Sequence, residues 1–308
     1  MPRTNPVPRR RLLRAGGALA TAAALTPTVQ AHAAGSASDD VTARLRSLER
    51  EYDARLGVYA HNTRTGRTVT YRAGEPFAMC SLFKAFAAAA VLRDHSGRGG
   101  RAGRTGLDEV IHFPPADILP NSEHSAAFVE TGIPVRDACA LAVRYSDNTA
   151  GNLMLRRIGG PAGLTRFFRS LGDGVSRLDR WETDLNTAIP GDPRDTTTPY
   201  AIGRSLERLA LGRALDGAGR RQLVAWLRGN TTSTKRFGAG LPAGWTLADK
   251  TGTGSYASAH DLGVAWTTRG TPVVLAVLST KAERDAPVDE TVIERTARLL
   301  AAAVAPGE

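Results

Sequence analysis

The chain has 308 residues, of which 42% are hydrophobic and 23% charged, so it is long enough for a large core and has an ordinary globular composition. Its 40 Lys and Arg against 30 Asp and Glu give a net charge of +10, which at first suggests an acidic partner such as nucleic acid. Five of those arginines lie before residue 34, the other charges are scattered and only 6% of the residues are aromatic, so we expect no nucleic-acid partner.

The first 33 residues have the pattern of an export signal. Arg9-Arg10-Arg11 precedes a run of small apolar residues, Ala15 to Leu25, and Ala31-His32-Ala33 offers a cleavage site of the A-x-A type. Paired arginines favour the twin-arginine route. A membrane anchor is the alternative, but the apolar run is well short of the roughly 20 residues that span a bilayer. We therefore expect a twin-arginine signal peptide over residues 1–33 and a secreted protein without a membrane anchor.

A helix and then a hairpin are expected after the signal. Asp39 and Asp40 can cap a helix whose apolar residues recur at helical spacing, and Gly57 is expected to end it. Two strand-like runs follow, joined by a turn-rich stretch. The apolar helix positions are Val41, Leu45, Leu48 and Tyr52, and the strands are Val58–His61 and Thr68–Tyr71.

From about Ser81 to Leu227 the pattern indicates helices joined by loops. The longest loop, Arg180 to Pro199, contains Pro and Gly, and a loop of that length inside a compact domain is usually functional. The predicted helices are Ala85–Leu92, Val135–Val143, Thr149–Ile158 and Tyr200–Leu211.

Strands return near the C-terminus, and a final helix ends the chain. Strands at both ends with helices between them predict an α/β fold with an inserted all-α domain. We place the α/β domain at residues 38–72 plus 229–308 and the all-α domain at residues 73–228, with the functional loop at 180–195. The predicted C-terminal strands are Gly244–Lys250, Asp261–Thr268 and Pro272–Ser279, and the last helix has an apolar stripe from Val292 to Val304.

The sequence gives no support to metal chemistry. The histidines show no metal-site spacing, and the two cysteines, Cys80 and Cys139, are far apart. We expect no metal and no other cofactor. The two thiols could form a disulfide after export, although buried free thiols are favoured.

The sharpest local pattern is Ser81-Leu82-Phe83-Lys84, directly before an Ala-rich helix. A separation of three residues puts the hydroxyl and the amine on one helical face. Serine needs a base to become a nucleophile at neutral pH, and a partly desolvated lysine can be that base. The plain alternative is a serine helix cap followed by a solvated lysine.

Three more patterns follow in order. Ser146-Asp147-Asn148 stands just before a predicted helix, and Lys250-Thr251-Gly252 ends a predicted strand. Alone, the first would be a helix cap and the second a turn with a solvated lysine. Between them Arg180-Trp181-Glu182-Thr183-Asp184-Leu185-Asn186 opens the long loop. The four motifs together are far more specific than any one of them.

With these motifs the chain resembles the class A β-lactamases, over about residues 38 to 306. S-x-x-K, S-D-N and K-T-G are shared with penicillin-binding proteins, and the glutamate-bearing loop resembles the class A Ω-loop. The resemblance implies an antiparallel sheet flanked by helices, and a monomeric exported enzyme that hydrolyses the β-lactam amide of penicillins and cephalosporins and so gives antibiotic resistance. A D-alanyl-D-alanine peptidase and a non-catalytic β-lactam or cell-wall binding protein are the alternatives.

The resemblance also implies the roles of the motif residues in acylation. Ser81 attacks the lactam carbonyl, and its proton goes to Lys84, to Glu182 through a water, or to both. Ser146 passes a proton to the departing nitrogen. Backbone N–H groups of Ser81 and Thr253 form the oxyanion hole. The residues implied to bind substrate are Asn148, Lys250, Thr251, Gly252 and Thr253.

The long loop is implied to serve the second half-reaction. Glu182 and Asn186 hold the water that hydrolyses the acyl-enzyme. Arg180 and Asp195 match the salt bridge that closes the family's Ω-loop, with two solvated charges as the alternative. The bond between Glu182 and Thr183 is expected to be cis, as it often is in the family.

Two departures from the family pattern concern charge and cysteines. Many relatives bind the substrate carboxylate with an Arg at the place of Ala259, whereas others place it ahead of the K-T-G strand, where a count without gaps reaches Arg236. The alternative for Arg236 is a solvated loop charge beside Lys235. Cys139 matches one half of a family disulfide, but the partner position is Ala88, so we expect two free thiols.

Overall fold

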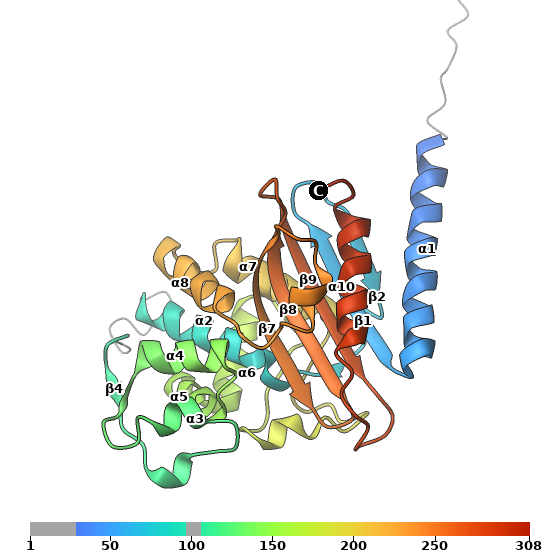
Figure 1. Ribbon diagram of the computed structural model, residues 1–308. Helices are drawn as coiled ribbons and strands as arrows, with labels where there is room; N and C mark the ends of the chain where they lie inside the picture. Colours follow the sequence, from blue (N-terminus) through green and yellow to red (C-terminus); the bar gives the residue numbers. More distant parts are fainter. Residues whose placement is uncertain (1–28, 97–105) are drawn as a thin grey trace, which may run out of the picture. The chain divides into compact units, whose positions relative to one another are not determined.

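Five strands from the two ends of the chain form one antiparallel sheet in this computed structural model, which describes residues 29–96 and 106–308. The order across the sheet is β2-β1-β9-β8-β7, so an N-terminal strand pairs with the C-terminal β9. Figure 1 shows the blue N-terminal strands beside the orange and red C-terminal ones. The strands are β1 Arg55–Asn62, β2 Thr68–Tyr71, β7 Thr246–Gly254, β8 Ser258–Trp266 and β9 Pro272–Thr280.

Hydrophobic side chains cover both faces of the sheet. One face packs on α10 (Thr291–Val304) and on the C-terminal half of α1 (Val29–Tyr52). The other face packs on the helical part of the chain, chiefly through α7 (Pro199–Ala210). A strand buried on both faces has a continuous apolar run instead of an alternating one, as residues 273–278 of β9 do.

Helices make up most of the chain between Phe83 and Arg228. In α2 (Phe83–His95) every residue up to Leu92 is buried, as expected of a helix at the centre of a helical layer. Its small alanines let α4, α5, α6 and α8 pack around it. The other helices and short strand pairs are α3 Glu123–Ala126, α4 Val135–Arg144, α5 Asn148–Ile158, α6 Gly160–Ser170, α8 Gly217–Arg228 and α9 Phe237–Gly240, with β3 Phe77–Ala78 paired to β6 Thr196–Thr197 and β4 Val110–Ile111 paired to β5 Ile133–Pro134.

The fold class was predicted correctly, but the start and end of the first helix were not. α1 begins at Val29 instead of at an Asp39 or Asp40 cap, because the preceding stretch contains several alanines and continues the helix. Gly57 lies inside β1 and does not end the helix. A Cβ at Gly57 would come 2.4 Å from the Phe77 ring, so the glycine permits a close approach between β1 and β3.

The K-T-G motif lies within a strand and not at its end. β7 continues to Gly254, because its pairing with β8 runs as far as the contact between Gly254 and Ser258. The motif is therefore part of a rigid sheet edge.

Two other predictions from the sequence concern the chain's organisation. The division into domains at residues 38–72 plus 229–308 and 73–228 stays a prediction. Of the predicted signal peptide, residues 1–28 lie outside the described residues. No helix in the described part of the chain is long and apolar enough to cross a membrane.

Candidate active site

A cavity of about 390 Å³ lies along the outer edge of β7 and brings together residues of all four sequence motifs. Its wall is formed by the turn before α2, the loop before α5, the long loop 180–199 and the edge strand. The lining residues are Ser81, Asn121, Tyr145, Ser146, Asn148, Asn186, Thr232, Arg236, Thr251, Thr253 and Glu290.

Ser81 lines this cavity, and the fully buried Lys84 lies beside it. Ser81 lies in a 3-10 turn, Cys80–Leu82, and Lys84 lies in the first turn of α2. Lys84 Nζ donates to Ser81 Oγ at 3.0 Å. Ser81 makes no side-chain cap to α2, so the helix-cap alternative is wrong.

The Lys84 ammonium is fully buried and surrounded by acceptors. It lies 2.9 Å from Glu182 Oε1 and donates to Asn148 Oδ1 at 2.6 Å and to the Ser146 carbonyl at 2.7 Å. A buried charge needs such compensation, because burial removes the hydration of the ion. The alternative of a solvated lysine is therefore also wrong.

The S-D-N motif combines a helix cap with two residues that face the cavity. Asp147 caps α5 by accepting from the Ala150 N–H at 2.9 Å, as the plain alternative expected. The side chains on either side of it contact the two lysines of the site. Ser146, with φ of 60°, accepts at Oγ from Lys250 Nζ at 3.1 Å, and Asn148 accepts from Lys84.

Lys250 is a second buried amine in the site. Its Nζ donates to Ser146 Oγ and, at 2.8 Å, to the carbonyl of Thr251. Burial, and next the nearby charge of Lys84, lower the pKa of Lys250 to about 7. The amine therefore changes its charge close to neutral pH.

The long loop presents Glu182 to the same point. Glu182 Oε1 accepts from Ser81 Oγ at 3.4 Å, and Oε2 accepts from Asn186 Nδ2 at 2.5 Å. The peptide bond between Glu182 and Thr183 is cis, as expected. Asn152 of α5, which the sequence analysis missed, holds the Glu182 backbone by a bond to its N–H at 3.0 Å and one to its carbonyl at 3.1 Å.

Arg180 and Asp195 close the base of that loop. Arg180 Nε lies 2.6 Å from Asp195 Oδ2, and the Asp195 carboxylate is fully buried. Asp195 Oδ1 accepts from the backbone N–H groups of Asp179 and Arg180, at 2.7 and 2.9 Å. The alternative of two solvated charges is wrong, because this carboxylate ties both ends of the loop together.

Arg236 lines the cavity but is buried, and only 3% of it is exposed. Its guanidinium donates to Glu290 Oε1 at 3.0 Å and to Thr253 Oγ1, the Gly252 carbonyl and the His260 carbonyl, each at 2.8 Å. A guanidinium has five N–H donors, so one N–H remains on Nη2. Arg236 is therefore not a solvated loop charge.

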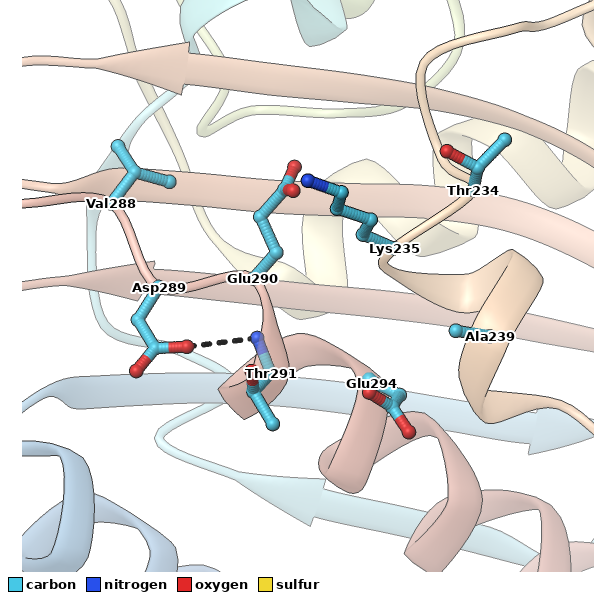
Figure 2. Close-up of a pocket in the computed structure, with 8 residues that line it drawn as sticks. All are labelled: Thr234, Lys235, Ala239, Val288, Asp289, Glu290, Thr291 and Glu294. Atoms are coloured by element: carbon cyan, nitrogen blue, oxygen red, sulfur yellow. Dashed lines mark hydrogen bonds between the residues drawn. The ribbon is translucent and has the colours of Figure 1, made fainter.

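The two neighbouring positions from the sequence analysis have other surroundings. Ala259 is buried in the hydrophobic cluster beneath α10 and lies directly opposite Thr253 in the sheet. Lys235 is exposed and lines a separate cavity of about 430 Å³. In Figure 2 this second cavity lies between the loop that carries Lys235 and the residues that lead into α10, with Asp289 bonded to the Thr291 N–H. Glu290 lines both cavities.

Several lining residues carry no motif by which sequence could have found them. Asn121 Nδ2 donates to the Ser146 carbonyl at 3.1 Å, and Thr232 Oγ1 lies 2.5 Å from Thr251 Oγ1. Tyr145 and Glu290 complete the wall. Single polar residues in loops give no periodic or spaced signal.

The two cysteines and the potential metal ligands bear on whether the described residues hold a further centre. Cys80 and Cys139 are both free and buried, as expected. Burial raises the pKa of the Cys80 thiol to about 12. Within residues 29–96 and 106–308, no group of three or more His, Cys, Asp or Glu is arranged to hold a metal ion.

Comparison with known proteins finds similarity to β-lactamases over nearly the whole chain. The model of the β-lactamase enzyme family matches residues 40–304. The chain is 48% identical over 298 residues to Beta-lactamase AST-1 of Nocardia asteroides, covering 95% of this chain and 94% of that protein. The solved β-lactamase of Streptomyces albus G has a TM-score of 0.81 at 48% identity and covers 85% of this chain and 98% of its own. A class A β-lactamase described as the last common ancestor of Gram-negative bacteria has a TM-score of 0.81 at 47% identity, over 85% of this chain and 98% of its own.

Removing the Arg180 side chain should loosen the long loop. Arg180→Ala leaves the buried Asp195 carboxylate without its charged partner, which should lower the free energy of unfolding by about 1.5–3 kcal/mol. We expect a lower Tm and faster proteolysis between residues 180 and 199.

Arg194→Ala is the matched control, because Arg194 lies in the same loop but its ion pair with Asp192 is half exposed, at 50% for the arginine. If Arg180→Ala had the Tm and cleavage pattern of this control, the bridge would not hold the loop.

Proposed function

The chain belongs to the class A β-lactamases, which are serine hydrolases of β-lactams, and we propose that it opens the ring of penicillins and cephalosporins through a covalent acyl-enzyme on Ser81. The observation that carries the proposal is the buried contact of Ser81 Oγ with Lys84 Nζ at 3.0 Å and with Glu182 Oε1 at 3.4 Å. A hydroxyl between an amine and a carboxylate can give up its proton as it attacks a carbonyl carbon.

Two routes for the Ser81 proton fit these distances. In one route the Lys84 ammonium first gives a proton to Glu182 across their 2.9 Å contact, and the neutral amine then takes the Ser81 proton; in the other the Ser81 proton passes through a water to Glu182. When the tetrahedral intermediate collapses, the C–N bond of the lactam breaks and the nitrogen needs a proton. Ser146, bonded to Lys250 at 3.1 Å, is the proposed donor.

The remaining groups at the rim fit the substrate's polar ends. Backbone N–H groups of Ser81 and Thr253 are the proposed oxyanion hole, where one donor typically contributes about 3–4 kcal/mol. Lys250, Thr251, Gly252, Thr253 and Arg236 form the proposed carboxylate subsite, and Asn148 the subsite for the side-chain amide. This assignment is supported by the position of the residues. Lys250 and Gly252 bond to residues that line the cavity, and the other members of these subsites line it themselves: Ser81, Asn148, Arg236, Thr251 and Thr253.

Deacylation is assigned to Glu182 and Asn186. The carboxylate would deprotonate a water that attacks the ester, and the serine recovers its proton as it leaves. The 2.5 Å bond from Asn186 Nδ2 to Glu182 Oε2 supports this pairing. A D-alanyl-D-alanine peptidase would keep its adduct for longer, so nitrocefin turnover together with intact mass separates these functions.

We also propose that the protein is exported by the twin-arginine route and contributes to antibiotic resistance as a monomer. The support for export is the sequence pattern of residues 1–33. Resistance follows from export, because drug destroyed outside the membrane never reaches its target.

The two half-reactions should separate by mutation. Ser81→Ala lacks the nucleophile and should form no adduct with benzylpenicillin. Glu182→Ala should be acylated but should fail to deprotonate the water that hydrolyses the ester. Penicilloyl-enzyme should therefore accumulate and be visible by intact mass. Turnover of Glu182→Ala at the wild-type rate without an adduct would contradict the assigned role.

The charge of Lys250 should make substrate binding depend on pH. Since its pKa is lowered to about 7, the ammonium is present below that pH and is lost as the pH rises. The KM for benzylpenicillin should therefore increase from pH 6 to pH 9. Lys250→Arg keeps its charge over this range and should flatten the profile. A wild-type KM that stayed constant from pH 6 to 9 would count against Lys250 as a carboxylate anchor.

Arg236→Ala should weaken recognition of the substrate carboxylate. A hydrogen bond to a charged group contributes about 1.5–3 kcal/mol, so we expect KM for benzylpenicillin to rise about 10- to 150-fold and inactivation by clavulanate-like inhibitors to slow. Arg236→Lys should recover only part of the loss, because an ammonium lacks the planar fork.

The control is Lys235→Ala, which removes a neighbouring exposed charge. Lys235 does not line the cavity that contains Ser81, so KM for benzylpenicillin should hardly change. Adduct formation at saturating drug should survive in Arg236→Ala. If KM did not change, Lys250 and the two threonines would hold the carboxylate without Arg236.

A further inference from the structure

Two buried carboxyl groups beneath the K-T-G strand each have an oxygen without a partner. Asp249 of β7 is 2% exposed and Asp261 of β8 is 0% exposed. Neither Asp249 Oδ2 nor Asp261 Oδ1 accepts a hydrogen bond from an N–H or hydroxyl donor of the described chain. Leaving two such oxygens ionised and unpaired in the interior would be very unfavourable.

Strand register brings these two carboxyl groups together. Asp261 lies opposite Thr251, and Asp249 lies opposite Gly263. Because side chains alternate along a strand, Asp249, Thr251 and Asp261 share one face of the sheet, and the two aspartates are diagonal neighbours on it. Their side chains are within hydrogen-bonding reach of each other.

The other oxygens of the two groups already have donors. Asp261 Oδ2 accepts from the Phe237 N–H at 3.1 Å. The Ser233 hydroxyl lies within hydrogen-bonding reach of Asp249. The atoms that lack partners are thus one oxygen on each carboxyl, and a single proton between them would satisfy both.

We propose that Asp249 and Asp261 share one proton between their unpaired oxygens, and that the pair positions the carboxylate-binding end of the active site. In this arrangement the protonated Asp261 donates to Asp249. The pair as a whole carries a single negative charge.

The charges around the pair agree with one negative charge and not two. Burial and then the charge of Asp249 raise the pKa of Asp261 well above its usual range, and burial also raises the pKa of Asp249. Two ionised carboxylates in contact would repel each other without water to screen them. The side chain of His260 points to the other face of the sheet. The charged groups on the neighbouring segments are Lys250 and Arg236, Glu290 paired with Arg236, and Glu294 paired with Arg298.

The pair is connected to the cavity wall on two sides. On one side Asp249 lies next but one to Thr251 on the same face of the sheet, and Thr251 Oγ1 lies 2.5 Å from Thr232 Oγ1. On the other side Asp261 holds the N–H of the residue that follows Arg236. Thr251 and Arg236 both line the cavity, so the pair sets the spacing between two groups of the proposed carboxylate subsite.

The shared proton can be tested by the pH dependence of unfolding, without reference to activity. Unfolded aspartates release their protons near pH 4, whereas the folded pair retains one. Above about pH 4.5 the unfolded state binds fewer protons than the folded pair, so wild-type stability falls as pH rises for as long as the folded pair keeps its proton. In Asp261→Asn the amide donates to Asp249 and no proton is retained. The ratio of unfolding constants, wild type over Asp261→Asn, should therefore rise about tenfold per pH unit.

Asp249→Asn distinguishes a shared proton from simple burial of Asp261. If the proton is shared, this variant also removes the need for it and should show the same rise. If Asp261 were protonated because of burial alone, Asp249→Asn would keep the wild-type slope, and sharing would be disproved. Asp285→Asn is the control at an exposed carboxyl and should follow wild type. A ratio that stays constant with pH for Asp261→Asn would overturn the proposal.

The positioning role rests on the proposed function and has its own measurement. Asp261→Asn keeps both hydrogen bonds and should keep KM for benzylpenicillin within about threefold, whereas Asp261→Val breaks them and should raise KM at least tenfold with kcat little changed. Equal KM values for the two variants would disprove positioning even if the pH test supported the shared proton. Absence of any turnover by wild type would instead refute the proposed function.

Discussion

The Lys84 ammonium, fully buried, is the charge on which the arrangement of the site depends. Its acceptors come from three separate segments: Ser81 in the turn before α2, Ser146 and Asn148 at the start of α5, and Glu182 in the long loop. An ion without water is stable only while such partners stay in place. The same charge therefore holds all three segments at one point. Loss of one acceptor would shift the ammonium and so change its contacts with the remaining acceptors.

Packing around α2 determines where that ammonium lies. The helix is buried along nearly its whole length, and its alanines allow neighbouring helices to approach closely. Gly151 of α5 continues this pattern, because a Cβ there would be 2.9 Å from Lys84 Cε. The lysine stem thus passes close to the backbone of α5 at Gly151. A larger residue at position 151 would push the amine away from Ser81 and Glu182.

Much of the site could be predicted because its chemistry is concentrated in short motifs whose spacing is fixed by local structure. Asp147 illustrates the limit of such reasoning. The S-D-N motif contains a helix cap, Asp147, between two residues that face the cavity, Ser146 and Asn148. Asn152, Thr232 and Glu290 could not be predicted, because their roles depend on which distant segments meet. For Arg236, counting along the chain gave the position, but its burial and four hydrogen bonds arise only from tertiary packing. Gly57 was misread for the same reason, since its neighbour Phe77 is distant in sequence.

The three cations of the site differ in how their charge is balanced. Lys84 lies against Glu182, and Arg236 lies against Glu290. Within the described chain, Lys250 has no carboxylate at ion-pair distance, and the nearest negative charge in its own strand belongs to Asp249, whose side chain points to the opposite face. Its bonds go instead to a hydroxyl and a carbonyl. An anionic ligand in the cavity would balance the charge of Lys250. The attraction between the ligand and the ammonium would be strong, because the amine is already removed from water. The amine without a carboxylate partner thus belongs to the proposed carboxylate subsite.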